Sequence, residues 1–299
     1  MSTVAQAVGT FVWHEQVSPD PRQAQEFYTQ LFGWGTETFG DDYAMISSGG
    51  AAHGGYGRAM EGAPPPHWLN HVQVADVDAT VEDAKRAGGT LAAGPFDMPG
   101  VGRMAIIGDP QGAYVGVYHP EGDWAAPGGV FVWTELGTTD VDAAQRFYEQ
   151  VFDWTTKDPG AEYGGYRIFH RDENDANGIA GLMANPSADI PAYWNPYVAV
   201  ESPDATVAKA KELEATILVE PTDIPGIGRF AIIRDPQGAV FGVIRAEPLL
   251  ALAEAGLATV VVVELFLALG ERAGTAANNP HYHGMAPSSR DTARAPSRT

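Results

Sequence analysis

The 299-residue sequence contains no cysteine, which excludes disulfides, thiolate metal sites and cysteine nucleophiles. It is also poor in basic residues, with 18 Lys and Arg against 38 Asp and Glu and a formal net charge of −20. Such a charge repels nucleic acids and anionic membrane surfaces, so we expect neither as a partner. The chain also lacks Gly-x-Ser-x-Gly and His-Glu-x-x-His, which leaves serine hydrolase and zinc protease functions without support.

The two ends of the chain carry separate expectations. Residues 1–13 lack a basic region followed by an apolar run, so we expect no secretion signal and a cytoplasmic protein. Residues 249–269 are apolar apart from Glu254, Thr259 and Glu264. Each central acidic side chain costs about 2.5–3.5 kcal/mol on membrane insertion. We therefore expect this segment to pack on the body or on a second chain, as in a homo-oligomer, rather than to anchor the protein in a membrane.

Two blocks of sequence occur twice in the chain. Phe11–Trp34 returns as Phe131–Trp154 at an offset of 120, with 12 of 24 positions identical. Arg103–Val117 returns as Arg229–Val243 at an offset of 126, with 11 of 15 identical. The chain is therefore built from two copies of a unit of about 115 residues. The six extra residues of the second copy are expected in a polar loop around Gly160–Gly178.

Each copy reads as a strand, a helix and three strands, twice over. In the first copy, Thr10–Val17 is predicted to be a strand, and Asp20 suits the N-cap of the helix that follows. Pro21 suits the first helical position, and Gly33 ends the apolar run of helical spacing. The same succession starts again with a strand at Leu69–Ala75.

This pattern and its motifs resemble the vicinal oxygen chelate superfamily, which includes glyoxalase I, the bleomycin-resistance proteins and the extradiol dioxygenases. The resemblance rests on the repeated helix block from Asp20 to Trp34, its copy from Asp140 to Trp154, and the Asp-Pro-Gln-Gly turns at Asp109–Gly112 and Asp235–Gly238. It covers about Thr10 to Ala246. It implies an α+β fold of four βαβββ modules forming two cup-shaped domains. We place these at residues 8–122 and 128–247, with residues 248–299 as a C-terminal extension.

The alternation of side chains along a strand predicts which residues face each cup. In the strand Phe131–Leu136, Val132, Thr134 and Leu136 are expected to face the helix, which directs Trp133 and Glu135 into the second cup. The same register directs Trp13 and Glu15 into the first cup and places Val12, His14 and Gln16 on the helix side. Along the strand that follows Leu69, His71 and Gln73 are expected in the cup, opposite Val72 and Val74.

The resemblance assigns metal-ligand roles to some of these positions. His71 stands where the family's His-Val-x-x-x-Asp motif places a histidine ligand, and Glu15 is a second candidate ligand for a divalent metal. The family's glutamate on the last strand falls at Gly116 here and at Gly242 in the second copy. Tyr197 takes the position of His71 in the second copy. The first copy is therefore one ligand short of the usual three, and the second copy is two short.

Structural explanations also fit these residues. The repeated Glu15 and Glu135 could pair with the repeated Arg103 and Arg229. The large aromatic residues could belong to the core, since such side chains dominate core burial.

We expect a protein that binds a small organic molecule in a cup without a complete metal site. The candidate ligand-binding residues are Trp13, Gln73, Tyr118, Trp133, Glu135 and Tyr197. The alternative is a metal-dependent lyase, isomerase or dioxygenase of the glyoxalase type. It would use Glu15 and His71 as catalytic residues and metal ligands in the first domain.

Overall fold

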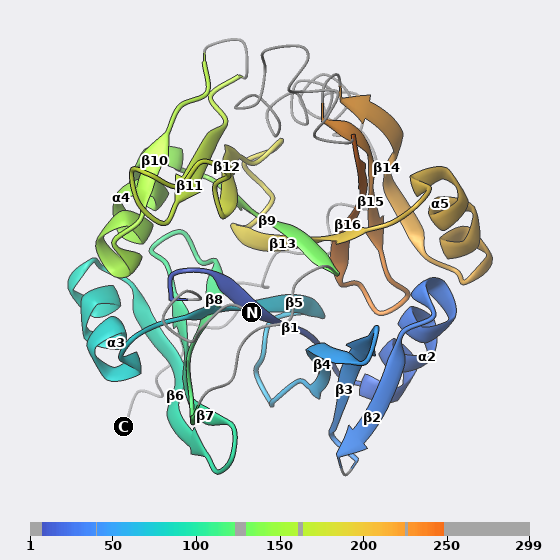
Figure 1. Ribbon diagram of the computed structural model, residues 1–299, viewed down its shortest axis with the longest axis horizontal. Coiled ribbons are helices and arrows are strands. Elements are labelled where there is room, and N and C mark those ends of the chain that lie inside the picture. The colour runs from blue at the N-terminus through green and yellow to red at the C-terminus, as the bar shows by residue number, and fades with distance from the viewer. Residues whose placement is uncertain (1–7, 40, 123–129, 161–163, 225–226, 248–299) are drawn as a thin grey trace, which may run out of the picture.

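A computed structural model describes residues 8–39, 41–122, 130–160, 164–224 and 227–247 of the chain (Figure 1). The C-terminal extension, including the apolar segment at 249–269, lies outside the described residues. Within the described part, no helix has the length and apolar character needed to cross a membrane.

The first half of the chain forms one eight-stranded sheet in the order β2-β3-β4-β1-β5-β8-β7-β6. Its strands are β1 (Phe11–Ser18), β2 (Gly35–Phe39), β3 (Tyr43–Ser48), β4 (Ala51–Arg58), β5 (His67–Gln73), β6 (Thr90–Met98), β7 (Gly102–Gly108) and β8 (Tyr114–Pro120). Two helices, α2 (Pro21–Phe32) and α3 (Val77–Arg86), connect β1 to β2 and β5 to β6. The first βαβββ module therefore supplies one half of the sheet and the second module the other half, joined where β1 pairs with β5.

The second half repeats this arrangement, with the sheet order β10-β11-β12-β9-β13-β16-β15-β14. Its strands are β9 (Phe131–Thr138), β10 (Thr155–Lys157), β11 (Arg167–His170), β12 (Ala180–Ala184), β13 (Tyr193–Ala199), β14 (Thr216–Ile224), β15 (Gly228–Arg234) and β16 (Val240–Ala246). Its helices are α4 (Val141–Phe152) and α5 (Pro203–Glu212). The predicted α+β fold of four βαβββ modules is confirmed.

Local sequence explains how the first helix begins and ends. The Asp20 side chain accepts hydrogen bonds from the backbone N–H groups of Arg22 and Gln23, and Pro21 opens the helix. Gly33 ends it in the left-handed conformation with φ of 72°, which glycine adopts without steric cost. The predicted cap and stop of this helix are therefore both present.

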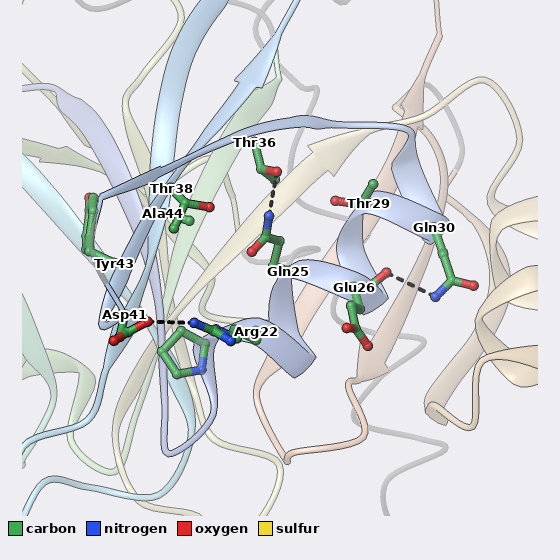
Figure 2. Close-up of a pocket in the computed structure, with 11 residues that line it drawn as sticks. Arg22, Gln25, Glu26, Thr29, Gln30, Thr36, Thr38, Asp41, Tyr43 and Ala44 are labelled. Carbon is green, nitrogen blue, oxygen red and sulfur yellow. Dashed lines mark hydrogen bonds and ion pairs between the residues drawn. The ribbon is translucent and has the colours of Figure 1, made fainter.

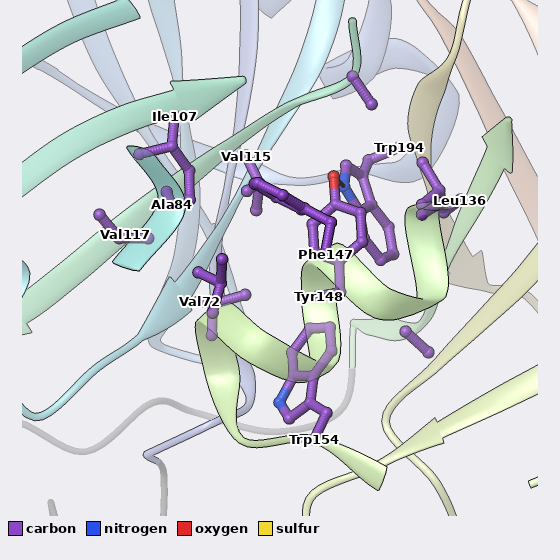
Figure 3. Close-up of a cluster of buried hydrophobic side chains, with 14 of the residues drawn as sticks. Val72, Ala84, Ile107, Val115, Val117, Leu136, Phe147, Tyr148, Trp154 and Trp194 are labelled. Carbon is purple, nitrogen blue, oxygen red and sulfur yellow. Dashed lines mark hydrogen bonds between the residues drawn. The ribbon is translucent and has the colours of Figure 1, made fainter. Parts of the chain in front are cut away.

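The two sheets lie back to back, and their concave faces point away from each other (Figure 1). At the flanks, α3 packs beside α4 and α2 beside α5. The main hydrophobic clusters are consequently shared between the halves. One cluster joins Val72, Ala84 and Ile107 of the first half to Phe147 and Trp154 of the second (Figure 3). Each half therefore completes the core of the other.

Two matching sets of hydrogen bonds cross between the halves. The Tyr28 hydroxyl donates to Oδ2 of Asp235 at 2.9 Å and accepts from Nε1 of Trp68 at 3.1 Å. The counterpart Tyr148 donates to Oδ2 of Asp109 at 3.1 Å. The other carboxylate oxygen of Asp109 accepts backbone N–H groups of its own turn. The repeated Phe-Tyr and Asp-Pro-Gln-Gly motifs are therefore parts of one structural network.

Two sequence expectations were wrong. The pairing of β9 with β13 shifts between Phe131 and Trp133, so Val132 is the extra residue of a β-bulge and is 46% exposed instead of facing the helix. The same shift in β1 packs Val12 against Tyr118 rather than against the helix. In addition, the stretch Gly160–Gly178, expected to be a loop, contains β11, which pairs with both β10 and β12.

Candidate functional site

The first cup brings Glu15 and His71 together at its centre. The Nε2 atom of His71 lies 3.2 Å from Oε2 of Glu15, and the two side chains are hydrogen-bonded. The His71 side chain is almost fully buried, whereas the Glu15 side chain keeps 19% of its surface exposed. β1 and β5 are paired here, with Trp13 directly opposite His71. The pair is thus fixed by sheet register, and its carboxylate is reachable from the cup.

Tyr43 of β3 completes this group and was missed by the sequence reasoning. Its hydroxyl accepts a hydrogen bond from Nε1 of Trp13 at 3.2 Å, and both Tyr43 and Trp13 hydrogen-bond Glu15. The second half holds Tyr166 in the same place. The repeat of this tyrosine is hidden in the sequence because the insertion in the second half changes the offset between the copies.

The environment of Glu15 favours its ionised form. Burial acts to raise the pKa of Glu15, but the hydrogen bond and charge of His71, together with the hydrogen bonds from Tyr43 and Trp13, hold the pKa below its usual value. An ionised carboxylate is only a hydrogen-bond acceptor. The first cup therefore presents a fixed anionic acceptor.

Two glycines flank this pair where the neighbouring strands run beside it. Gly55 of β4 is level with Glu15, and Gly116 of β8 is level with His71. A Cβ atom at Gly116 would lie 2.1 Å from Nδ1 of His71, and one at Gly55 would lie 2.2 Å from the Tyr43 hydroxyl oxygen. The rings of His71 and Tyr43 thus occupy the space that side chains at these positions would need.

The remaining candidates of the first cup lie one step along the same strands. Gln73 is fully buried, and β5 pairs with β8 so that Gln73 is level with Tyr118. The Tyr118 hydroxyl donates to the backbone oxygen of Val101 at 2.8 Å, and its ring packs with Trp13 and Met104. Tyr118 therefore connects the floor of the cup to the β6–β7 hairpin.

The second cup repeats the frame with different chemistry. Glu135 accepts hydrogen bonds from the hydroxyls of Tyr197 at 3.2 Å and Tyr166 at 3.3 Å, and Trp133 donates to Tyr166 at 3.1 Å. Burial raises the pKa of Glu135 to about 8, because the two tyrosine hydrogen bonds only partly offset it. This carboxyl is therefore neutral at pH 7. Gly242 lies beneath the Tyr197 ring, as Gly116 lies beneath His71.

Apolar side chains of the chain itself fill the second cup. They form a third hydrophobic cluster, which contains Tyr166, Ile168, Tyr197, Ile224, Ile227, Phe230 and Ile232. Trp133, Met183, Leu218, Val219, Val240 and Ile244 pack against it. Among the described residues, the corresponding cluster of the first cup holds Val12 and Tyr118, with Trp13 and Met104 packed against them. The two cups therefore differ mainly in how far their own side chains occupy them.

The donor set does not fit a metal centre of the family type. Glu15 and His71 offer two ligands where a catalytic metal normally has three, and the rings over Gly55 and Gly116 leave no room for another side chain at those positions. Among the described residues, no group of three His, Asp or Glu side chains is arranged to hold a metal ion.

The structure also excludes the expected pairing of Glu15 and Glu135 with arginines. Arg103 pairs with Asp78 at 2.8 Å and with Asp97 at 2.7 Å. Its counterpart Arg229 pairs with Asp204 at 2.6 Å and Asp223 at 3.0 Å. The repeated arginines therefore tie helices α3 and α5 to the neighbouring hairpins and do not touch the cups.

A separate pocket of about 470 Å³ lies between α2 and the β2–β3 hairpin (Figure 2). Its polar groups bond to one another: Gln25 donates to Thr36 at 2.5 Å, and Arg22 pairs with Asp41 at 2.6 Å. No set of unsatisfied groups converges there, so we take the first cup as the candidate site.

Comparisons with known proteins identify the relatives of this architecture. The model of the Glyoxalase/Bleomycin resistance protein/Dioxygenase superfamily matches residues 10–117 and 130–243. The protein named "Putative glyoxylase CFP32" of Mycobacterium tuberculosis is 36% identical over 253 residues, covering 80% of this chain and 96% of the relative. "Anthracycline biosynthesis protein DauV" of Streptomyces sp. (strain C5) is 31% identical over 261 residues, covering 80% and 94%.

Solved structures of low sequence identity share the fold. The Mn(II)-bound glyoxalase from Novosphingobium aromaticivorans has a TM-score of 0.59 at 16% identity, covering 80% of this chain and 82% of its own. The 2,3-dioxygenase LapB from Pseudomonas sp. KL28 has a TM-score of 0.56 at 11% identity, covering 81% and 94%. At these identities the likeness concerns the fold alone.

Proposed function

Because this chain belongs to the glyoxalase/bleomycin resistance protein/dioxygenase superfamily, we propose that its first cup binds a small organic molecule without the help of a metal ion. The single observation that carries the proposal is the contrast between two matched frames. The second cup is filled by its own apolar cluster and holds a neutral carboxyl, whereas the first holds an ionised, partly exposed Glu15.

The residues of the first cup have separable roles in this proposal. Glu15 accepts a hydrogen bond from the ligand, while His71 and Tyr43 hold the carboxylate in place. Trp13 and Tyr118 provide aromatic surface beside it, and Gln73 extends the polar floor. Convergent polar groups within an otherwise apolar concave surface are typical of small-molecule sites.

The names of the relatives support a ligand of this kind. One relative is described as a glyoxylase and another as a protein of anthracycline biosynthesis, and both descriptions concern small organic molecules.

Native mass spectrometry of the purified full chain tests the proposal. We expect a small organic molecule to co-purify with the native chain at up to one copy per chain, and to be lost with Glu15→Ala. Dialysis against a chelator should leave the bound molecule in place. A molecule that stays bound in Glu15→Ala, or that leaves with the chelator, would contradict the proposal.

The second candidate is a metal-dependent lyase, isomerase or dioxygenase that uses Glu15 and His71. The structure of a Mn(II)-bound glyoxalase with the same fold is the observation that favours it. It requires one further ligand from solvent or substrate, because the described residues of the first cup supply only two. Elemental analysis after loading with Mn²⁺ or Fe²⁺ separates the two candidates. Stoichiometric metal that disappears in His71→Ala would support the second candidate.

A further inference from the structure

At three positions the first cup has a smaller side chain than the second. The first cup has Gly57, Ala92 and Ala93 where the second has Met183, Leu218 and Val219. Gly57 and Met183 correspond because each pairs with the same position of the first strand, Val17 and Gly137 respectively. In the second half all three large side chains pack against the apolar cluster of the cup. The first cup lacks this filling.

Sheet register shows that Gly57 and Ala93 face the first cup, and Ala92 is the unpaired residue beside Ala93, as Leu218 is beside Val219. Ala93 is opposite Ile106, and Phe96 is opposite Met104, whose side chain packs with Tyr118 in the cup. A Cβ atom at Gly57 would approach Tyr43 no closer than 3.9 Å, so this glycine has free space above it, unlike Gly55. A methionine could therefore be accommodated at Gly57 only by taking up room in the cup.

The β6–β7 hairpin of the first half shows the same difference at the rim. Met98 and Val101 are 43% and 42% exposed, whereas their counterparts Ile224 and Ile227 are 1% and 4% exposed and belong to the cluster of the second cup. The first half thus leaves the apolar side chains of its rim without the packing that their counterparts have. Exposed apolar residues around a concave site are typical of a ligand-binding surface.

Resting on the proposed function, we infer that the ligand is a fused-ring aromatic molecule that carries a hydroxyl or ammonium group. Its apolar body lies over Gly57, Ala92 and Ala93, in the space that Met183, Leu218 and Val219 fill in the other cup. Its polar group donates a hydrogen bond to Glu15. The molecule completes in the first cup the apolar cluster that the chain itself completes in the second.

The aromatic side chains around the first cup favour a fused-ring aromatic ligand. Trp13 and Tyr118 contribute ring surface at the floor, and Phe96, 48% exposed, contributes a ring at the rim. Flat aromatic ligands bury large areas against such rings and gain from offset stacking. The ligand needs an O–H or N–H group, because the ionised Glu15 carboxylate can accept hydrogen bonds but cannot donate one.

Binding of three naphthalenes to the full chain tests the inference. We expect 2-naphthol and 2-naphthylmethylammonium to bind at least tenfold more tightly than 2-methoxynaphthalene, which has no donor, when titrated at pH 7 by calorimetry. Whichever of 2-naphthol and 2-naphthylmethylammonium binds more tightly shows whether the ligand carries a hydroxyl or an ammonium group. Equal affinity for all three, or no binding of any, overturns the inferred ligand class.

Filling the first cup tests where the apolar body lies. The combined change Gly57→Met, Ala92→Leu and Ala93→Val should weaken 2-naphthol binding at least tenfold while leaving the melting temperature unchanged or higher. Ala92→Leu alone keeps the test valid if the combined variant does not fold, and should weaken binding at least threefold. Ala79→Leu, on the exposed face of α3, adds the same side chain outside the cup and should not change the affinity.

The two outcomes separate this inference from the proposed function. If the filled variants bind 2-naphthol as tightly as the native chain does, the placement of the ligand is wrong. If the co-purifying molecule still depends on Glu15 in that case, the metal-free binding function stands without it.

Discussion

The two cups of this chain share a frame and differ in content. In both, a tryptophan and a glutamate of the first strand meet a tyrosine at the start of the third strand or directly before it, and a glycine leaves room for a ring beside the glutamate. In the first cup the glutamate is ionised, because the interaction with His71 lowers its pKa. In the second cup burial raises the pKa of the glutamate, and the hydrogen bonds from Tyr197 and Tyr166 only partly offset this, so the carboxyl is neutral. A few side chains around a common frame thus decide how much of a cup is occupied by an apolar cluster of the chain itself.

The largest expected difference between the cups concerns pH. Folding raises the pKa of Glu135 to about 8, so the folded chain keeps a proton that the unfolded chain releases above about pH 4.5. Stability from this group is therefore complete at low pH and falls by about 1.4 kcal/mol per pH unit until about pH 8. Glu135→Gln should remove this decline, as measured by urea unfolding from pH 5 to pH 9.

The first cup should show the opposite dependence. The pKa of Glu15 is lowered on folding, so its contribution is present above its unfolded pKa and is lost as the pH falls below that value. Glu15→Gln should therefore lose stability relative to the native chain at pH 7 and approach it in acid. Difference profiles of the same sign for the two variants would contradict the contrast between the cups.

Substitution of the glycines beneath the rings should be the next largest effect. Gly116→Ala forces a Cβ atom against His71, and Gly242→Ala forces one against Tyr197. Overpacking of this kind costs about 1–3 kcal/mol. We expect similar losses in urea unfolding for both variants, but a loss of 2-naphthol affinity only for Gly116→Ala. An undisturbed affinity would show that the position of the His71 ring does not matter for binding.

Replacing each of the two glutamates with glutamine should separate the cups in binding. Glu15→Gln keeps the shape of the side chain and removes its charge, so we expect 2-naphthol affinity to fall about tenfold, as for a lost charge-assisted hydrogen bond. Glu135→Gln should leave the affinity within a factor of two. Calorimetry at pH 7 measures both. A larger loss of 2-naphthol affinity for Glu135→Gln than for Glu15→Gln would show that the ligand binds in the second cup.

The smallest difference is expected for the tyrosines that link the two halves, because their hydrogen bonds are the same in both. Tyr28→Phe and Tyr148→Phe each remove a hydroxyl that links the halves and leave a tryptophan N–H without its acceptor. We expect each to cost about 1–2 kcal/mol in urea unfolding, with little difference between them. Markedly unequal losses would show that the scaffold, and not only the cups, has diverged.

The fold and the frame of the cups could be predicted from the sequence because the same motifs occur in both halves. The modules, the helix caps and the cup-facing positions of Trp13, Glu15 and His71 follow from repeated blocks and from strand alternation. The bulges at Val12 and Val132 could not be predicted, because an extra residue in one strand becomes visible only when its partner is placed beside it. The pairing of Arg103 with Asp78 and Asp97 also depends on a helix and hairpin that meet only in three dimensions.

The content of the cups was harder to predict than their frame. Met183 and Leu218 stand at positions where the first copy has glycine and alanine, but the insertion in the second copy obscures the alignment at that point. The burial of Ile224 and Ile227 depends on several strands at once. The filling of the second cup therefore follows from contacts between strands that are far apart in the sequence.

The hydrogen bonds that cross from Tyr28 to Asp235 and from Tyr148 to Asp109 make the two halves equivalent to the subunits of a dimer. If the halves were separate chains with this interface, a mixture of them would assemble in three combinations, two of which pair like with like. Joining them in one polypeptide removes those two combinations. Every molecule then carries one cup of each kind, and this ratio is set at translation rather than by the concentrations of two gene products.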